Sequence, residues 1–279
     1  MDLSSVTSWR AATQRADLAT LATTAGETVV AGGTWLFSEP QPDVTGLVDL
    51  TTLGWPAVEA APGGGVRVAA TCSIEELVAA AEDGRLAALG AGPSVAALVR
   101  DAAESLLMSP KIWHTATVGG NVCLGLPAGA MTSLAVALDA EAVVWTADGG
   151  ERREPVATFV QGARVTALAP GEVLRGLDVP AASLAATAVL RRVALTTYGR
   201  TAALVTARRD PDGTVVLGAT GSLPRPAVLR SAGTPGPAEV DAWVDGLGAD
   251  PGWYDDAHGA PDWRAAMTRR LAHEAVAAL

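Results

Sequence analysis

Two glycine pairs mark places where this chain could bind an anion. Gly32-Gly33 ends a β-branched run in VVAGGTWLF, and Gly119-Gly120 precedes Asn121 in ATVGGNVCL. Glycine has no Cβ, so a ligand can approach its backbone closely, and an unpaired backbone amide can donate a hydrogen bond to a phosphate oxygen. We interpret the two pairs as turns with bare amides that together bind one diphosphate.

Side chains beside the pairs suit a nucleotide-like ligand. Thr34, Thr117 and Asn121 carry small polar groups that can bond phosphate or ribityl oxygens. Trp35 and Trp113 flank the two pairs, and each could either stack on an adenine or isoalloxazine ring or cover the core. Together these residues favour a flavin site built from two loops. For the tryptophans, stacking on the cofactor and covering the core both remain possible.

Other nucleotide and hydrolase sites lack their motifs. No G-x-G-x-x-G follows a strand and no P-loop motif occurs, which excludes the Rossmann and P-loop sites. No G-x-S-x-G nucleophile elbow is present. Taken alone, a glycine pair is an ordinary turn, Cys123 is a small buried apolar side chain, and His114 faces solvent or ends a strand.

Composition excludes further classes. A net charge of -10 and a pI near 4.8 argue against a nucleic-acid partner, which needs clustered basic residues. Cys72 and Cys123 are too few to bind an iron–sulfur cluster, and with three histidines the chain lacks a zinc-like spacing, so any redox metal must lie on another chain. The sequence shows neither a secretory signal nor a membrane span, so we expect a cytoplasmic protein.

Alternating helices and strands must position the two glycine pairs. We expect a helix over 11–23 and strands over 28–31 and 46–50. Ser73 is predicted to cap a helix that ends near 82, and an apolar run predicts a helix over 130–138. Further strands are expected at 66–69, 142–146 and 173–179.

The chain divides into three predicted units, which cover 1–52, 53–180 and 181–279. In the third, strands over 188–196, 202–207 and 214–219 surround a hairpin turn at 209–213. A Pro, Gly and Ala segment at 224–237 then leads to terminal helices over 238–247 and 261–278. Strands followed by helices indicate an α+β arrangement for this unit.

The glycine motifs resemble those of a known family, the FAD-binding medium subunit of molybdenum hydroxylases such as xanthine dehydrogenase and carbon monoxide dehydrogenase. AGGTWL and ATVGGN are similar to the family's AGGTDL and ATIGGN. The segments PAGAMTSLAVALDA, PGEVLRGLDVP and RPAVLR also match in order, as does the arginine-bearing terminal helix. The resemblance therefore covers essentially the whole chain.

The resemblance implies a fold and a cofactor site. The expected fold is α+β: a vanillyl-alcohol-oxidase or PCMH-type FAD-binding domain of two α/β lobes, then a CO-dehydrogenase-flavoprotein-type C-terminal domain. FAD is expected on this chain, with no catalytic or metal-ligating residue. Its implied binding residues are Ala31, Gly32, Gly33, Thr34, Trp35, Leu36, Thr117, Val118, Gly119, Gly120, Asn121, Leu174 and Tyr198.

The resemblance also implies a role in electron transfer. The flavin subunit takes electrons from a small subunit with 2Fe-2S clusters and passes them to NAD, oxygen or a quinone, while a large molybdopterin subunit oxidises the substrate. This chain departs from the family at Ala130, Trp35 and Trp113-His114, which removes a carboxylate and a cation. That altered polarity leaves two alternatives: a stand-alone FAD oxidoreductase acting on a small molecule, and an interaction scaffold without cofactor.

Overall fold

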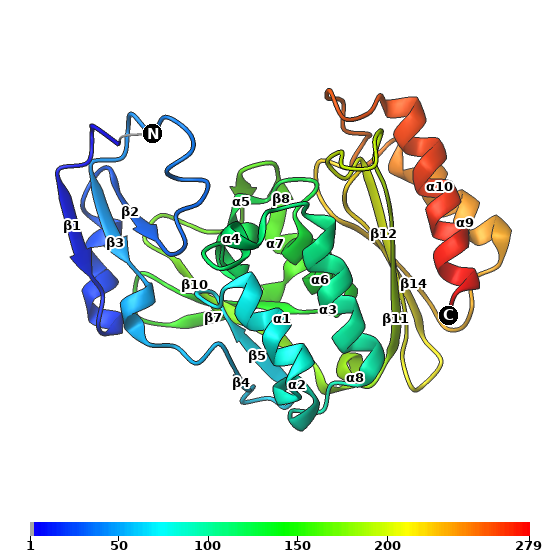
Figure 1. The fold of residues 1–279 in the computed structure, drawn as a ribbon, viewed down its shortest axis with the longest axis horizontal. Coiled ribbons are helices and arrows are strands. Elements are labelled where there is room, and N and C mark those ends of the chain that lie inside the picture. Colours follow the sequence, from blue (N-terminus) through cyan, green and yellow to red (C-terminus); the bar gives the residue numbers. More distant parts are fainter. Residues whose placement is uncertain (1–2) are drawn as a thin grey trace.

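The structure, a computed structural model, describes residues 3–279 and contains three larger β-sheets and one two-stranded ribbon. The larger sheets stand in a row from the N-terminal side at the left to the C-terminal side at the right (Figure 1). Helices lie between the second and third sheets and on the outer face of the third.

The N-terminal sheet has three parallel strands in the order β1-β3-β2. Val48, in the middle strand, is fully buried and clusters with Leu18 and with Val173 of the central sheet, so this cluster joins the two sheets. The elements are β1 (Ser8–Ala11), the 3-10 helix η1 (Arg15–Ala22), β2 (Glu27–Val30), β3 (Gly46–Asp49) and the 3-10 helix η2 (Thr51–Leu53).

The central sheet has five antiparallel strands in the order β4-β5-β10-β6-β7. Its middle strand is β10, and all seven residues of that strand are buried. Arg67 on the neighbouring strand pairs with Asp178 of β10 through two bonds of 2.6 and 2.8 Å, so the buried charges are matched. The strands are β4 (Val58–Ala60), β5 (Val66–Ala69), β6 (Glu141–Trp145), β7 (Glu151–Pro155) and β10 (Val173–Val179).

Helices α3 and α6 fill the space between the central and C-terminal sheets, because α3 contacts β11 and α6 contacts β12 and β13 (Figure 1). All eight residues of α6 are buried, as expected for a mostly apolar helix between two layers. The helices and ribbon of this region are α1 (Ile74–Glu82), α2 (Arg85–Ala88), α3 (Pro93–Ser105), α4 (Pro110–Trp113), α5 (Val118–Leu124), α6 (Ala130–Ala137), α7 (Val156–Phe159), β8 (Val160–Gly162), β9 (Val165–Thr166) and α8 (Ala181–Leu184).

The C-terminal sheet is an antiparallel meander in the order β11-β12-β13-β14. Helices α9 and α10 cover its outer face, with α10 against β11 and β12 (Figure 1). The elements are β11 (Thr187–Val193), β12 (Ala203–Arg209), β13 (Val215–Ala219), β14 (Ala227–Ser231), α9 (Pro237–Leu247) and α10 (Pro261–Ala277).

Several predicted elements are confirmed. Ser73 caps α1, since its hydroxyl accepts from the Glu76 amide at 3.1 Å while the Glu76 carboxylate accepts from the Ser73 amide at 2.8 Å. The strands predicted at 66–69 and 173–179 have those bounds.

The helix predicted over 11–23 is confirmed in part, as the 3-10 helix η1 over Arg15–Ala22. Its predicted start is wrong, because Ala11 belongs to strand β1, which pairs with β3. Arg10 on β1 reaches Glu27 on β2 at 3.0 Å, and the Asp17 carboxylate accepts from the Thr13 amide at 2.8 Å. Strand pairing before residue 12 and the capping contact of Asp17 therefore place the start of the helix at Arg15. The segment 224–237, expected as a connection, contains strand β14.

The strands of the three larger sheets fall within the ranges 1–52, 53–180 and 181–279, whose boundaries stay predictions. Within residues 3–279, no helix combines the length and apolar character needed to cross a membrane.

Candidate functional site

The two glycine loops touch each other. A Cβ placed on Gly32 would lie 1.9 Å from the Thr115 carbonyl oxygen and 3.2 Å from the Ala116 Cα. Thr115 and Ala116 directly precede the second glycine loop, so Gly32 is the point at which the N-terminal lobe meets it. Because atoms cannot approach that closely, glycine is required there for the contact to form.

A cleft of about 560 Å³ opens where the loops meet. That volume falls in the range of small-molecule and cofactor sites. Of the residues named from the sequence, eleven line it: Ala31, Gly32, Gly33, Thr34, Trp35, Leu36, Thr117, Gly119, Gly120, Asn121 and Leu174.

Two of the named residues lie away from the cleft wall. Val118 is buried in the main core beneath the second loop. Tyr198 is 90% exposed, in the connection between β11 and β12. For these two residues, as for the eleven on the cleft wall, the role as cofactor contacts remains a prediction.

The first loop presents a row of free backbone donors. Within residues 3–279, the six amides from Ala31 to Leu36 donate no hydrogen bond to the protein; the first internal bonds of this turn run from the Phe37 amide to the Gly33 carbonyl and from the Ser38 amide to the Trp35 carbonyl. Gly33 has a φ of +66°, which favours glycine. Consecutive unpaired amides in a turn form a concave anion site, so this loop fits the FAD diphosphate.

In the second loop the amides of the glycine pair are bonded within the protein, so the expectation of bare amides at Gly119 and Gly120 is wrong. The glycine pair lies in the first turn of α5, where Thr117 is the N-cap and its hydroxyl accepts from the Gly120 amide at 3.1 Å. The Val118 amide donates to the Cys72 carbonyl at 2.8 Å, and the Gly119 amide donates to the Ala70 carbonyl at 2.9 Å. The second loop therefore forms a wall of the cleft.

Gly119 is needed for packing of that wall. A Cβ on Gly119 would lie 2.5 Å from the Ala70 Cβ, so its missing side chain lets α5 approach the end of β5. Asn121 is also used internally, because its carbonyl oxygen accepts from the Met131 amide at 2.9 Å and so caps α6.

The tryptophans beside the loops have different surroundings. Trp35 lines the cleft, and the Arg164 guanidinium lies 4.9 Å from its ring centroid, a cation–π contact between the first lobe and the β8–β9 turn. Trp113 packs against the main core, and its Nε1 is buried without a partner in the described part of the chain. His114 is exposed and bonds Glu75, and that carboxylate raises the pKa of the imidazole.

Sequence reasoning missed residues that enter the cleft from other elements. Ser105, Leu106 and Met108 come from the end of α3 and the segment after it, and Arg200 and Thr201 come from the C-terminal domain. No local motif marks them, since they reach the cleft through long-range packing. Cys123 also lines the cleft; burial raises the pKa of its thiol to about 12, so the thiol is protonated at neutral pH.

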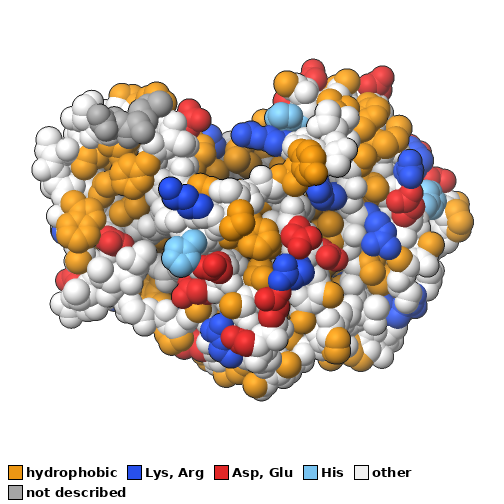
Figure 2. Space-filling model, viewed as in Figure 1, with side chains coloured by type: hydrophobic (Ala, Val, Ile, Leu, Met, Phe, Trp, Pro, Cys, Tyr) orange, Lys and Arg blue, Asp and Glu red, His pale blue; other side chains and the backbone are white. Residues whose placement is uncertain are grey.

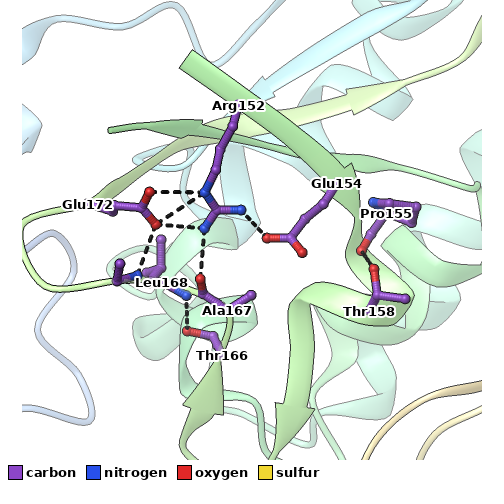
Figure 3. Close-up of polar contacts among 9 residues, drawn as sticks. Arg152, Glu154, Pro155, Thr158, Thr166, Ala167, Leu168 and Glu172 are labelled. Atoms are coloured by element: carbon purple, nitrogen blue, oxygen red, sulfur yellow. Dashed lines mark hydrogen bonds and ion pairs between the residues drawn. The ribbon is translucent and has the colours of Figure 1, made fainter. Parts of the chain in front are cut away.

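Glu172 is a carboxylate on the cleft wall whose charge is already matched. It accepts from the Arg152 guanidinium at 3.0 and 2.6 Å and from the Ala169 amide at 2.9 Å (Figure 3). Arg152 also donates to the Ala167 carbonyl at 2.7 Å and to Glu154. The hydrogen bonds from Arg152 hold the pKa of the Glu172 carboxyl below its usual range against the opposing effect of burial. This network fixes the segment that precedes β10 at the edge of the cleft.

The position that departs from the family's acidic residue contributes nothing polar to the cleft. Ala130 is fully buried at the first turn of α6 and packs in the main core. This position therefore adds no negative charge to the cleft.

Comparison with known proteins identifies the family of the chain. The family model for the FAD binding domain in molybdopterin dehydrogenase matches residues 4–182. None of the curated proteins compared with the chain matches it.

Solved structures of similar fold cover nearly the whole chain. Carbon monoxide dehydrogenase from Oligotropha carboxidovorans is 22% identical with a TM-score of 0.80, over 99% of this chain and 99% of that one. Carbon monoxide dehydrogenase from Hydrogenophaga pseudoflava is 20% identical with a TM-score of 0.79, over 98% of this chain and 96% of that one. Quinoline 2-oxidoreductase from Pseudomonas putida 86 is 18% identical with a TM-score of 0.75, over 100% and 99%.

These matches confirm the predicted α+β fold of the PCMH type and the prediction of FAD as the cofactor. The chain belongs to the family of FAD-binding domains of molybdopterin dehydrogenases, as a flavoprotein subunit of a molybdenum hydroxylase-type oxidoreductase.

Proposed function

We propose that this chain takes electrons from a 2Fe-2S subunit and passes them to NAD, oxygen or a quinone, next to a large molybdopterin subunit that oxidises the substrate. The row of free amides in the first loop, at the edge of a cleft of cofactor size, carries this proposal. These amides are the donors that the FAD diphosphate would need.

The residues of the cleft suit a binding and shielding role. When bound, FAD supplies the redox chemistry, and the protein binds it, orients it and excludes water. Leu106, Met108 and Leu174 give the cleft apolar walls. In residues 3–279, no three His, Cys, Asp or Glu side chains gather into a metal-binding group, and two cysteines cannot ligate a cluster, which supports electron supply by another chain.

The surface supports protein partners over nucleic acid. On the face drawn in Figure 2, basic side chains are scattered among acidic ones and form no broad basic patch. That distribution agrees with the net charge of -10 and offers no track for a phosphate backbone.

Purification of the tagged full-length chain from its own host tests this function. We expect FAD, iron and molybdenum to co-purify, because the electron donor and the substrate site would lie on tightly bound partners. Absorption spectroscopy measures the flavin, and elemental analysis measures the two metals.

The same measurement separates the alternatives. A yellow protein without iron or molybdenum that is reduced by a small-molecule donor would overturn the proposal in favour of a stand-alone FAD oxidoreductase. A colourless chain with no affinity for added FAD would support an interaction scaffold. Trp35 departs from the family pattern, and the Arg164 guanidinium contacts its ring in the cleft. This contact is the observation that favours the stand-alone enzyme as the second candidate.

A further inference from the structure

Arg200 is a cation on the cleft wall whose charge the protein leaves unmatched. The cleft-lining residues within 3–279 include two charged ones, Glu172 and Arg200. Glu172 is neutralised by Arg152, at 2.6 Å. Arg200 forms no ion pair and donates no hydrogen bond to any described residue.

Hydrogen bonds of the next two residues hold the backbone beside Arg200 in place, although the Arg200 side chain has no partner. The Thr201 hydroxyl donates to the Ser105 carbonyl at 2.8 Å, and Thr201 is 3% exposed. The Ala202 amide donates to the Val193 carbonyl at 2.9 Å, which closes the connection between β11 and β12. The C-terminal domain therefore presents Arg200 to the cleft from an anchored position.

Arginines in another hollow of the molecule are paired, in contrast to Arg200. A hollow of about 550 Å³ lies between the central sheet and β14 and includes Arg153 and Arg230. Arg153 contacts Asp178 at 2.5 Å, and Arg230 contacts Asp139 at 2.7 Å. The guanidinium groups of Arg153 and Arg230 are therefore in ion pairs within the protein, whereas the Arg200 guanidinium is free to bind a ligand.

The charge of the cofactor gives this free guanidinium a role. A diphosphate taken into a cleft of a protein with net charge -10 loses solvation and is repelled unless a cation faces it. The amides of the first loop offer dipoles without net charge. Arginine binds phosphate oxygens through two parallel donors. We propose that Arg200 pairs with the FAD diphosphate and supplies the positive charge that the glycine loops lack.

This inference rests on the cleft being the FAD site, and flavin titration of the full-length chain stripped of cofactor tests both. We expect Arg200→Gln to weaken FAD binding by about 10- to 100-fold, the effect of losing a charge-assisted hydrogen bond. Binding of riboflavin, which has no phosphate, should be unchanged, and Arg200→Lys should retain part of the affinity for FAD.

The matched control is Arg225→Gln. It removes the same charge from the same domain, at an exposed ion pair with Asp250, and should leave FAD affinity unchanged. Equal FAD affinity in wild type and Arg200→Gln, or an equal loss of riboflavin binding, would overturn the inference while the cleft assignment stands. Wild-type chain that binds no FAD would overturn the cleft assignment itself. Circular dichroism verifies that each variant folds. If Arg200→Gln does not fold, Arg200→Lys is measured in its place. An FAD affinity of Arg200→Lys equal to that of the wild type would then overturn the proposed pairing.

Discussion

Replacing Gly32 by alanine is expected to abolish stoichiometric FAD binding. The new Cβ would lie 1.9 Å from the Thr115 carbonyl oxygen, a backbone atom that cannot rotate away, so the first loop must move off the second. Overpacking of this kind costs at least about 1–3 kcal/mol, and the displaced amides from Ala31 to Leu36 would lose their common direction. We expect FAD affinity to fall by at least about 100-fold, measured by fluorescence titration.

A glycine elsewhere on the chain provides the control for that substitution. A Cβ added to Gly233 would meet no atom within 4 Å, and its φ is not positive, so Gly233→Ala should bind FAD as the wild type does. Thermal unfolding of both variants shows whether Gly32→Ala loses FAD affinity through a change in the first loop alone or through unfolding of the whole protein. Full FAD occupancy in folded Gly32→Ala would refute the requirement for close contact between the loops.

Replacing Arg264 by methionine is expected to destabilise the C-terminal domain by about 3–5 kcal/mol, the usual cost of breaking a buried charged network. Arg264 is 1% exposed and donates to the carbonyls of Gly259 at 2.8 Å, Gly221 at 2.7 Å and Ala202. It also pairs with Asp256 at 2.5 Å. Methionine fills a similar volume but leaves those oxygens without donors, so urea unfolding should show a lower midpoint.

Arg270→Met is the matched control on the same helix. Arg270 is exposed and pairs with Glu274 one turn away, a contact worth only about 0.3–0.5 kcal/mol. A loss of stability as small at Arg264 as at Arg270 would show that the buried network of Arg264 contributes little. Because Arg264 bonds the carbonyl of Ala202, its loss should also loosen the neighbouring Thr201 and Arg200 at the cleft.

The sequence alone predicted those helices and strands whose local residue pattern matches their place in the folded protein. β5 and β10 are short stretches rich in Val and Leu that are buried in a sheet, and α1 begins at a capping box, so each was predictable from its own residues. β1 was not, because it exists through pairing with β3, which lies much later in the chain.

The glycine pairs predicted that the two loops meet at one cleft, but they did not predict which backbone amides are free. Both pairs have the same composition, yet the amides after Gly32 are free while those around Gly119 are bonded to carbonyls of Ala70 and Cys72. Those acceptors are distant from Gly119 in sequence, so no local pattern reports them. The same reason explains why Arg200 was not among the predicted contacts: it reaches the cleft from another domain.

Residue-resolved hydrogen exchange with and without FAD tests most directly whether the first loop binds the diphosphate. We predict strong protection of the amides from Ala31 to Leu36 when FAD is added, since these are the donors the protein leaves free. The amides of Val118, Gly119 and Gly120, already bonded, should change little. Unchanged exchange over residues 31–36 in the FAD-bound protein would contradict the account.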